Sequence, residues 1–335
     1  MKTLKACLLV LIGVYSLAAS GASAQTLVGL FDLDEGARPA AMGGAFAGLA
    51  EDDHVLYYNP AGLAFLRELH FGVLFESRFS RATYGSVAFA LPNVGGQILF
   101  LNVPDIVQRD DQGVALGDLP YKQVGVLIGS GFSLNEDPIN LEIPLATGLQ
   151  LKIYRVNTLP EGSGTTFSLT PSLLWSEERL MLADLPIQAL RVGLIAPDLL
   201  SLGITYGSEY HESWGPGFRA GASATLLGGL TLAADFESNG TFHLGGEWML
   251  TGLELEPFGV GELSIRLGLR NLGPLISPTL GFGLQVGDFR VDYAFMLHPE
   301  LPGNHRISFS ALFGPPNILL CTLRPESCPP DDPVE

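Results

Sequence analysis

The sequence has few charged residues, few cysteines and no long apolar run beyond its N-terminal segment. Charged residues make up 16% of the 335 residues, whereas a typical soluble domain holds roughly a quarter. The mean hydropathy is nevertheless +0.30, although no later uncharged apolar stretch reaches the roughly 18 residues that a spanning helix needs. An apolar chain without spanning helices must spread its apolar residues thinly, at every second position, as a membrane β-barrel requires.

Positive charge is also scarce, and the usual signatures of catalysis are missing. The chain has 18 Lys and Arg against 35 Asp and Glu, a formal net charge of −17, so we expect no nucleic-acid partner. The six histidines follow no metal-ligand spacing, and no Gly-x-Ser-x-Gly element occurs. Ser308 or Ser310 near His305 could form a hydrolase pair, but without an evident third group structural serines are favoured. We therefore expect no enzyme, no cofactor and no metal site.

The N-terminus carries a candidate targeting signal. Lys2 and Lys5 precede the apolar run Leu8 to Leu17, and small residues follow up to Ala24. This order is typical of a secretory signal peptide, so we predict that residues 1–24 are removed by cleavage after Ala24 and that the chain is exported. A transmembrane anchor is the competing interpretation, but the run is short for a membrane span.

Residues 69–313 form a succession of short segments in which apolar and polar positions alternate. In one of them, Phe289 and Val291 flank Arg290. We count about fifteen such segments and predict that each is a β-strand. Because a single-chain bacterial barrel has an even number of strands, we expect two neighbours around residues 187–210 to merge and give about fourteen. The expected fold class is all-β, a transmembrane antiparallel β-barrel in the bacterial outer membrane.

The polar face of these segments separates a membrane barrel from a soluble sandwich, which also has one apolar face per strand. A sandwich usually loads its solvent face with Lys and Glu, whereas here small residues are mixed with Arg and acids. This mixture suits a hydrated lumen, with lipid covering the apolar face and barrel closure satisfying the backbone. We predict that these charged side chains face the lumen: Arg219, Asp235, Glu247, Arg266, Arg270, Arg290, Asp292 and Arg306.

Two flanking segments do not alternate. Residues 25–68 are rich in Gly and in acids. Eight strands fill their own lumen and sixteen leave a channel, so we expect this segment to plug the barrel and to pair its acids with the lumen arginines. Residues 314–335 are acidic and Pro-rich, which predicts a disordered periplasmic tail. Its Cys321 and Cys328 could form a disulfide there, or remain free thiols.

Several stretches resemble a known family. Near the N-terminus they are Gly36–Phe46 (GARPAAMGGAF), Glu51–Asp53 (EDD) and Tyr58–Leu63 (YNPAGL). These resemble the N-terminal signature of the FadL/PorV-like outer-membrane barrels, which include long-chain fatty-acid transporters and PorV/PorQ proteins associated with a secretion system. We find a second resemblance, to the last strands of the PorV/PorQ branch, in the stretches Pro278–Leu284, Asp292–Phe295 and His305–Ser308. Together these stretches span about residues 34 to 313.

The resemblance implies a hatch inside a fourteen-stranded barrel, with hatch residues at Gly43, Gly44, Asn59, Pro60 and Ala61. It implies passive transport of small hydrophobic solutes across the outer membrane, with membrane lipid and hydrophobic small molecules as partners. The alternative is a non-transporting component that helps a secretion system bind or retain exported proteins. The sequence departs from the fatty-acid transporters in its short loops and in its acidic C-terminal extension.

Overall fold

The computed structural model describes residues 29–314 apart from 136–138, 140, 142, 183–184, 214, 258 and 273–274. The predicted cleavage after Ala24 and the predicted tail with Cys321 and Cys328 therefore lie outside the described residues, and they stay predictions.

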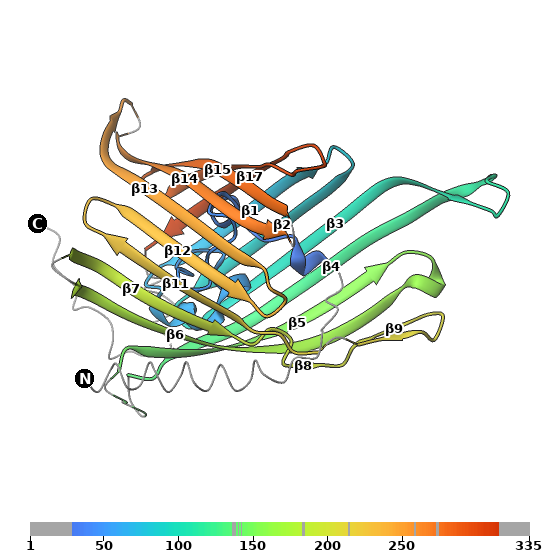
Figure 1. Ribbon diagram of the computed structural model, residues 1–335, viewed down its shortest axis with the longest axis horizontal. Coiled ribbons are helices and arrows are strands. Elements are labelled where there is room, and N and C mark those ends of the chain that lie inside the picture. The colour runs from blue at the N-terminus through green and yellow to red at the C-terminus, as the bar shows by residue number, and fades with distance from the viewer. Residues whose placement is uncertain are drawn as a thin grey trace, which may run out of the picture.

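Fourteen antiparallel strands form one closed barrel (Figure 1). Consecutive strands pair along the chain, β7 pairs with β11, and β1 pairs with β17 from Leu69 opposite Phe313 to Ser77 opposite His305. This last pairing closes the wall, so the all-β barrel predicted from the alternation is confirmed. The strands are β1 Leu69–Arg78, β2 Ala82–Leu91, β3 Val94–Arg109, β4 Ala115–Ser133, β5 Leu145–Asn157, β6 Gly164–Leu182, β7 Leu185–Ile195, β11 Arg219–Leu226, β12 Leu230–Glu237, β13 Phe242–Leu255, β14 Gly259–Leu272, β15 Leu275–Val286, β16 Phe289–Met296 and β17 Asn304–Phe313.

The region around residues 187–210 differs from the prediction, which merged two segments into one strand. Instead β7 ends at Ile195, and three short strands follow outside the barrel order: β8 Leu200–Ser201, β9 Ile204–Tyr206 and β10 His211–Glu212. Pro197 cannot donate a ladder hydrogen bond, and Asp198 has a φ of 53°, so the chain leaves the wall there. Because β8 and β9 pair with the wall only at β6, over two residues each, they add no strand to the wall, and the barrel still has fourteen strands.

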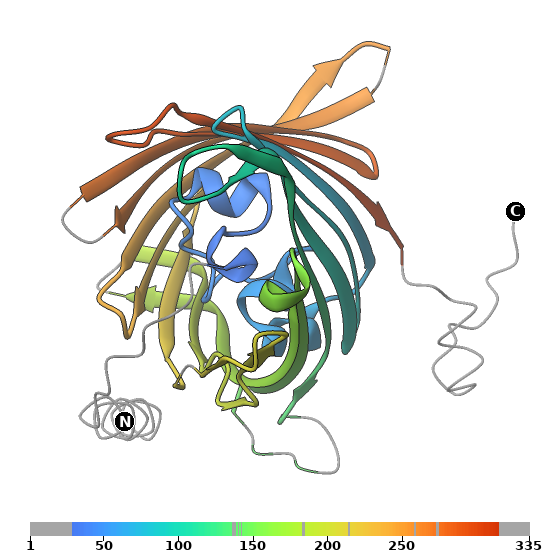
Figure 2. The same cartoon turned by 90° about the vertical axis from the view of Figure 1, so that its right-hand side faces the viewer.

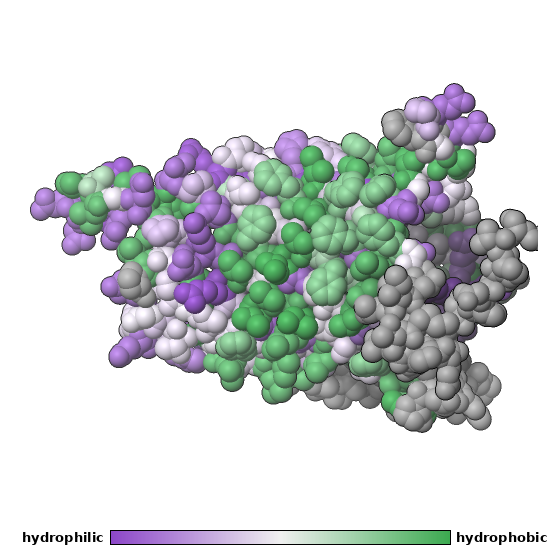
Figure 3. Space-filling view, turned by 180° about the vertical axis from the view of Figure 1, so that it is seen from behind, coloured by the Kyte–Doolittle hydropathy of each residue, from purple (hydrophilic) through white to green (hydrophobic). Residues whose placement is uncertain are grey.

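The two faces of the wall have opposite character. In β1 the side chains of Phe71, Val73 and Phe75 point outward and are 38–56% exposed, whereas Leu74 and Glu76 point inward and are buried. On the side shown in Figure 3, hydrophobic residues gather in a band across the middle of the barrel, and hydrophilic residues lie toward its ends. This is the surface that a lipid-embedded barrel presents.

Residues 29–68, called the inner segment below, lie inside the barrel (Figure 2). They form η1 Leu30–Asp32, α2 Ala37–Ala41, α3 Val55–Tyr58 and η2 Pro60–Phe65, and a further short turn, η3 Pro160–Gly162, follows β5. Within the described part of the chain, no helix has the length and hydropathy to cross a membrane.

Candidate functional site: the inner segment and the lumen wall

The backbone of the inner segment lies directly against the wall at glycine positions. A Cβ atom at Gly245 of β13 would come within 2.6 Å of the Met42 carbonyl oxygen, and one at Gly268 of β14 would overlap the backbone of Gly43. Protein interiors tolerate no such overlap. These lumen positions therefore need glycine, and the fit between segment and wall is tight there.

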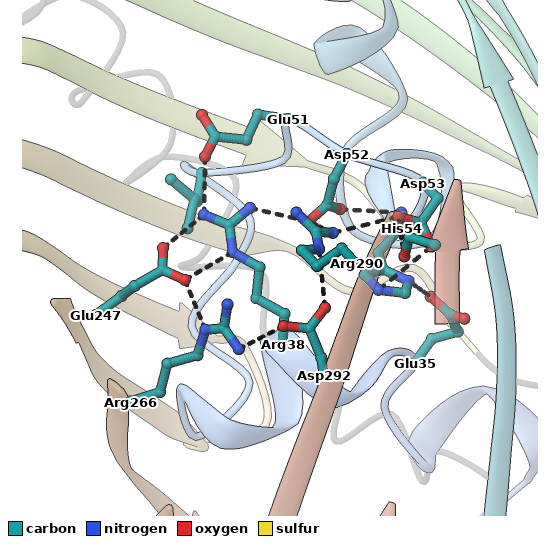
Figure 4. A network of polar contacts seen from close by, with 12 residues as sticks. Glu35, Arg38, Glu51, Asp52, Asp53, His54, Glu247, Arg266, Arg290 and Asp292 are labelled. Carbon is teal, nitrogen blue, oxygen red and sulfur yellow. Dashed lines mark hydrogen bonds and ion pairs between the residues drawn. The ribbon is translucent and has the colours of Figure 1, made fainter. Parts of the chain in front are cut away.

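Arg38 of α2 is the centre of a buried ion-pair network (Figure 4). Its guanidinium donates to Asp52 at 2.9 Å and to Glu51 at 2.9 Å, and it binds Glu247 of β13 through two hydrogen bonds of 2.6 and 3.0 Å. The Arg38 residue is only 7% exposed. A guanidinium can serve several carboxylates at once because its five donors form a planar fork.

The network continues along the wall and returns to the inner segment. Arg266 donates to Glu247 and to Asp292 at 2.6 Å each. Asp292 also forms an ion pair with Arg290 at 2.9 Å, and Arg290 reaches Asp52 at 3.3 Å. Each buried charge thus has an opposite charge beside it, which offsets the large cost of removing ions from water.

The remaining wall arginines make separate contacts with the inner segment. Arg270 pairs with Asp34. Arg306 pairs with Glu76 of β1 and donates to the Leu33 carbonyl at 2.8 Å. Further along the lumen, the Asp235 carboxylate binds both Arg219 at 2.7 Å and the backbone N–H groups of Phe46 and Ala47 at 2.9 Å. All eight charged residues expected in the lumen are thus on the inner face of the wall.

Asn59 fixes the second half of the inner segment. Its side-chain oxygen accepts from the Ala61 N–H at 3.1 Å, and its amide donates to the carbonyls of Ala47 at 2.9 Å and Leu173 of β6 at 3.2 Å. The side chain is fully buried. Pro60 opens η2, where its missing N–H costs nothing. One amide therefore ties two turns of the inner segment to the wall.

Gly43 and Gly44 form the tight turn that follows α2. Their φ values are 66° and 85°, in the left-handed region that favours glycine. The Gly43 carbonyl lies 2.7 Å from Nδ1 of His243 on β13. The turn therefore places a carbonyl against the wall where a larger residue would clash.

An apolar seam lies on another side of the inner segment, and sequence reasoning missed it. It comprises Leu30, Leu33, Val55, Leu56 and Leu63 of the inner segment and Leu74, Tyr84, Leu99, Leu127 and Tyr154 of β1 to β5. The expected lumen was polar throughout. The signal available was the loss of alternation in Ile98–Leu101 (ILFL), where both faces of the strand are apolar.

His54 lies between two carboxylates. Its Nδ1 is 2.7 Å from Glu35, and its Nε2 is 3.5 Å from Asp53. Burial alone would lower the pKa of His54, but the carboxylates of Asp53 and Glu35 outweigh it and raise that pKa to about 10. Burial, together with the charge of Asp52, raises the pKa of Asp53. Ligand atoms of Asp52, Asp53 and His54 lie within 4.8 Å of one another, close enough to share a metal ion.

The hydrolase pair considered from the sequence does not come together. His305 lies on the outer face, with Nδ1 2.7 Å from the Tyr293 hydroxyl. Ser308 and Ser310 are buried on the lumen face, where Ser308 accepts from the Ala37 N–H at 2.7 Å. Residues an odd number apart in a strand point to opposite faces, so neither serine can meet His305.

Comparison with known proteins rests on structure. No family model matches the chain, and no curated protein matches it. The CymD monoaromatic hydrocarbon channel is similar over 83% of this chain and 97% of its own, with a TM-score of 0.50 at 13% identity. A mutant of the TodX monoaromatic hydrocarbon channel is similar over 84% and 98%, with a TM-score of 0.47 at 12% identity.

The class that the fold defines is the outer-membrane β-barrel. Within that class, the fold of this chain is similar to that of the CymD channel. The likeness at this level of identity concerns the fold alone.

Proposed function

We propose that this chain is a channel for passive transport of small hydrophobic solutes across the outer membrane, in which the inner segment acts as a hatch. No chemical step and no cofactor are required. The observation that carries the proposal is the apolar seam between the inner segment and β1 to β5. The PorV/PorQ branch is not part of the proposal, because none of the contacts of the described residues favours a secretion role over transport.

The two sides of the hatch differ in what it costs to open them. On the side of β13 to β17, opening would separate buried ion pairs such as Arg38 with Glu247, and a buried charge that loses its partner typically costs about 3–5 kcal/mol. On the seam, Leu56 and Leu99 belong to one buried apolar cluster, in which Tyr84 also donates to the Asp34 carbonyl. An apolar solute that enters there replaces those contacts, whereas a polar solute would lose its hydration. The seam therefore favours apolar solutes.

Aromatic side chains at one end of the seam support a small aromatic solute as the first probe. Phe31 meets Tyr154 edge-to-face with ring centroids 5.7 Å apart, and Lys152 lies 4.4 Å from the centre of the Phe31 ring. Edge and face contacts of this kind also suit an aromatic guest. The name of the CymD barrel, which describes a monoaromatic hydrocarbon channel, points to the same class.

Uptake of radiolabelled toluene by cells tests the proposal, because an outer leaflet of lipopolysaccharide slows apolar molecules that would cross a simple vesicle unaided. Cells carrying the protein should take up toluene several-fold faster than cells without it, with no change in the uptake of a disaccharide. Leu99→Gln places an amide in the seam and should reduce toluene uptake. The matched variant Ile98→Gln changes the neighbouring residue on the outer face, which is 52% exposed, and should not.

Equal toluene uptake with and without the protein would remove transport of this class. Equal loss in the Leu99→Gln and Ile98→Gln variants would leave transport standing but would remove the seam as its route. Gel mobility with and without heating reports whether each variant forms a folded barrel.

A further inference from the structure

A carboxylate oxygen and an imidazole nitrogen, both of kinds that bind metal ions, face each other inside the hatch without a hydrogen bond. They are Oδ2 of Asp53 and Nε2 of His54, both fully buried and without a hydrogen-bond partner among the described residues. Each of the two residues is only 1% exposed. A buried polar atom of this kind costs free energy unless something binds it. The pair therefore needs a ligand or a proton between its members.

The distance between the two atoms suits a tetrahedral metal ion. Zinc binds imidazole nitrogen at about 2.0–2.1 Å and carboxylate oxygen at about 2.0–2.2 Å, so neighbouring ligands of a tetrahedral ion lie about 3.4 Å apart. Oδ2 of Asp53 and Nε2 of His54 are 3.5 Å apart. A direct hydrogen bond between nitrogen and oxygen would be shorter, near 2.9 Å.

The surroundings of His54 are those of a metal-binding histidine. Nδ1 of its ring is 2.7 Å from Oε2 of Glu35, and the other oxygen of Glu35 accepts from the Ser86 hydroxyl at 2.6 Å. A histidine that ligates a metal through one nitrogen almost always donates its other N–H to a carboxylate or carbonyl. Glu35, held by Ser86, thus directs Nε2 toward Asp53.

Two glycines border the ligand atoms. A Cβ atom at Gly36 would lie 2.5 Å from Nε2 of His54, and a Cβ atom at Gly72 of β1 would overlap Oδ2 of Asp53. Arg290 approaches Asp53 through the other oxygen, Oδ1, at 3.4 Å. No side chain from these neighbours therefore takes the position between the two atoms.

The ion-pair network in Figure 4 has a net negative charge that a divalent cation could balance. Counted without a proton on His54, which a metal ion at Nε2 would displace, six carboxylates against four guanidinium groups leave a charge of −2. The carboxylates are those of Glu35, Glu51, Asp52, Asp53, Glu247 and Asp292, and the guanidinium groups are those of Arg38, Arg191, Arg266 and Arg290. One divalent cation would balance this charge, whereas a proton on His54 would balance half of it.

We propose that the hatch binds one divalent transition-metal ion, of which Zn²⁺ is the representative, through Nε2 of His54 and Oδ2 of Asp53. Asp52, whose ligand atom is within 4.8 Å of theirs, borders the ion, and water completes its coordination. An imidazole and a carboxylate together suit zinc better than calcium or magnesium, which prefer oxygen alone. The ion would hold the turn at residues 51–54 in one conformation, and so would stiffen the hatch.

Zinc titration of the purified full chain in detergent tests the proposal, after removal of metal with EDTA. Cys321→Ser and Cys328→Ser form the background, because thiolates also bind zinc. We expect one zinc per chain by mass spectrometry and a thermal midpoint that rises with zinc but not with magnesium. His54→Gln and Asp53→Asn should each weaken zinc binding at least tenfold, and Glu35→Gln, which alters only the orienting group, about 10- to 100-fold.

His211→Asn is the matched control, because this exposed histidine of β10 can bind surface zinc only. X-ray absorption of the zinc form should show nitrogen and oxygen ligands at about 2.0 Å. The proposal is overturned if the metal-free chain takes up no zinc, or if His211→Asn removes the zinc that His54→Gln retains. Where His54→Gln does not fold, the Glu35→Gln affinity and the absorption spectrum decide. Neither readout involves solute uptake.

Discussion

Two adjacent glycines in β13 allow the fit of the inner segment against the wall to be tested with a single methyl group. Gly245 faces the lumen, where an added Cβ would lie 2.6 Å from the Met42 carbonyl oxygen and 2.7 Å from the Met42 Cβ. Gly246 faces outward, and its nearest neighbour is 3.5 Å away, at a Leu232 side-chain carbon. Alanine therefore overfills one face of the strand and fits the other.

The expected magnitude follows from the atoms that would be displaced. The Met42 carbonyl belongs to the backbone of the turn after α2, so Gly245→Ala must move the turn itself. Overpacking of this kind typically costs about 1–3 kcal/mol. A change of about 2 kcal/mol raises the population in which the inner segment is locally open by about 30-fold. Gly246→Ala should cost nothing, because it gives an extended residue a side chain in open space.

Hydrogen exchange measured by mass spectrometry is the appropriate assay, because it reports local opening of the hatch while the barrel stays folded. Peptides covering residues 37–50 should exchange about 30-fold faster in Gly245→Ala and at the wild-type rate in Gly246→Ala. Equal exchange of these peptides in the two variants would refute the tight contact between segment and wall.

Three other substitutions test the charges and the orientation of the wall. Arg38→Met should lower the free energy of unfolding by about 3–5 kcal/mol, because it leaves buried carboxylates short of a partner. The control Arg67→Met changes an exposed arginine and should alter the free energy of unfolding by less than about 0.5 kcal/mol. Urea unfolding in detergent compares the two variants. Burial would raise the pKa of Asp34, but the charge of Arg270 outweighs it and lowers that pKa below 3.8. Its contribution to stability is therefore fully present above pH 3.8 and is lost as the pH falls through the folded-state pKa. Asp34→Asn should be destabilising at pH 7 and progressively less so as the pH falls below 3.8, and equal destabilisation at every pH would contradict this. Leu267→Arg places a charge on the outer face, where Leu267 is 66% exposed, and should cost about 2–4 kcal/mol in a bilayer; no loss of stability in lipid vesicles would mean that this face does not meet lipid.

The wall could be predicted from the sequence because its information is local. Along β16 the alternation of Phe289, Arg290, Val291 and Asp292 assigns each residue to one face, and the structure keeps that assignment. A period of two residues is a property of the strand itself, so it survives without knowledge of the neighbours. The same logic identified the lumen positions of the wall arginines.

Opposite charge allows the acids of the inner segment to be matched with the wall arginines as a group, but the individual contacts across the lumen could not be predicted in this way. Asp53 and His54 are consecutive in the chain, but Glu35, which orients His54, lies 19 residues earlier, so no metal-ligand spacing appears. The bend after Ile195 also differs from the prediction, because the expected merger around residues 187–210 follows the apolar pattern on both sides of Pro197. Proline in a central strand argues against continuation, and that argument was the stronger one.

The choice of basic residue shows why the inner segment is held on one side. The chain has 14 arginines but only 4 lysines, two of them in the first five residues. A lysine at position 38 would be a point charge on a flexible stem, whereas the fork of Arg38 binds Glu51, Asp52 and Glu247 together. Hydrogen bonds of this guanidinium form only at defined angles, so the inner segment has one orientation on its charged side. Apolar contacts have no such angular requirement, so on the seam only a few hydrogen bonds, such as those from Tyr84 to the Asp34 carbonyl and from Gln150 to the Leu56 carbonyl, set an orientation. We expect a hatch that turns about its charged side rather than one that leaves the barrel.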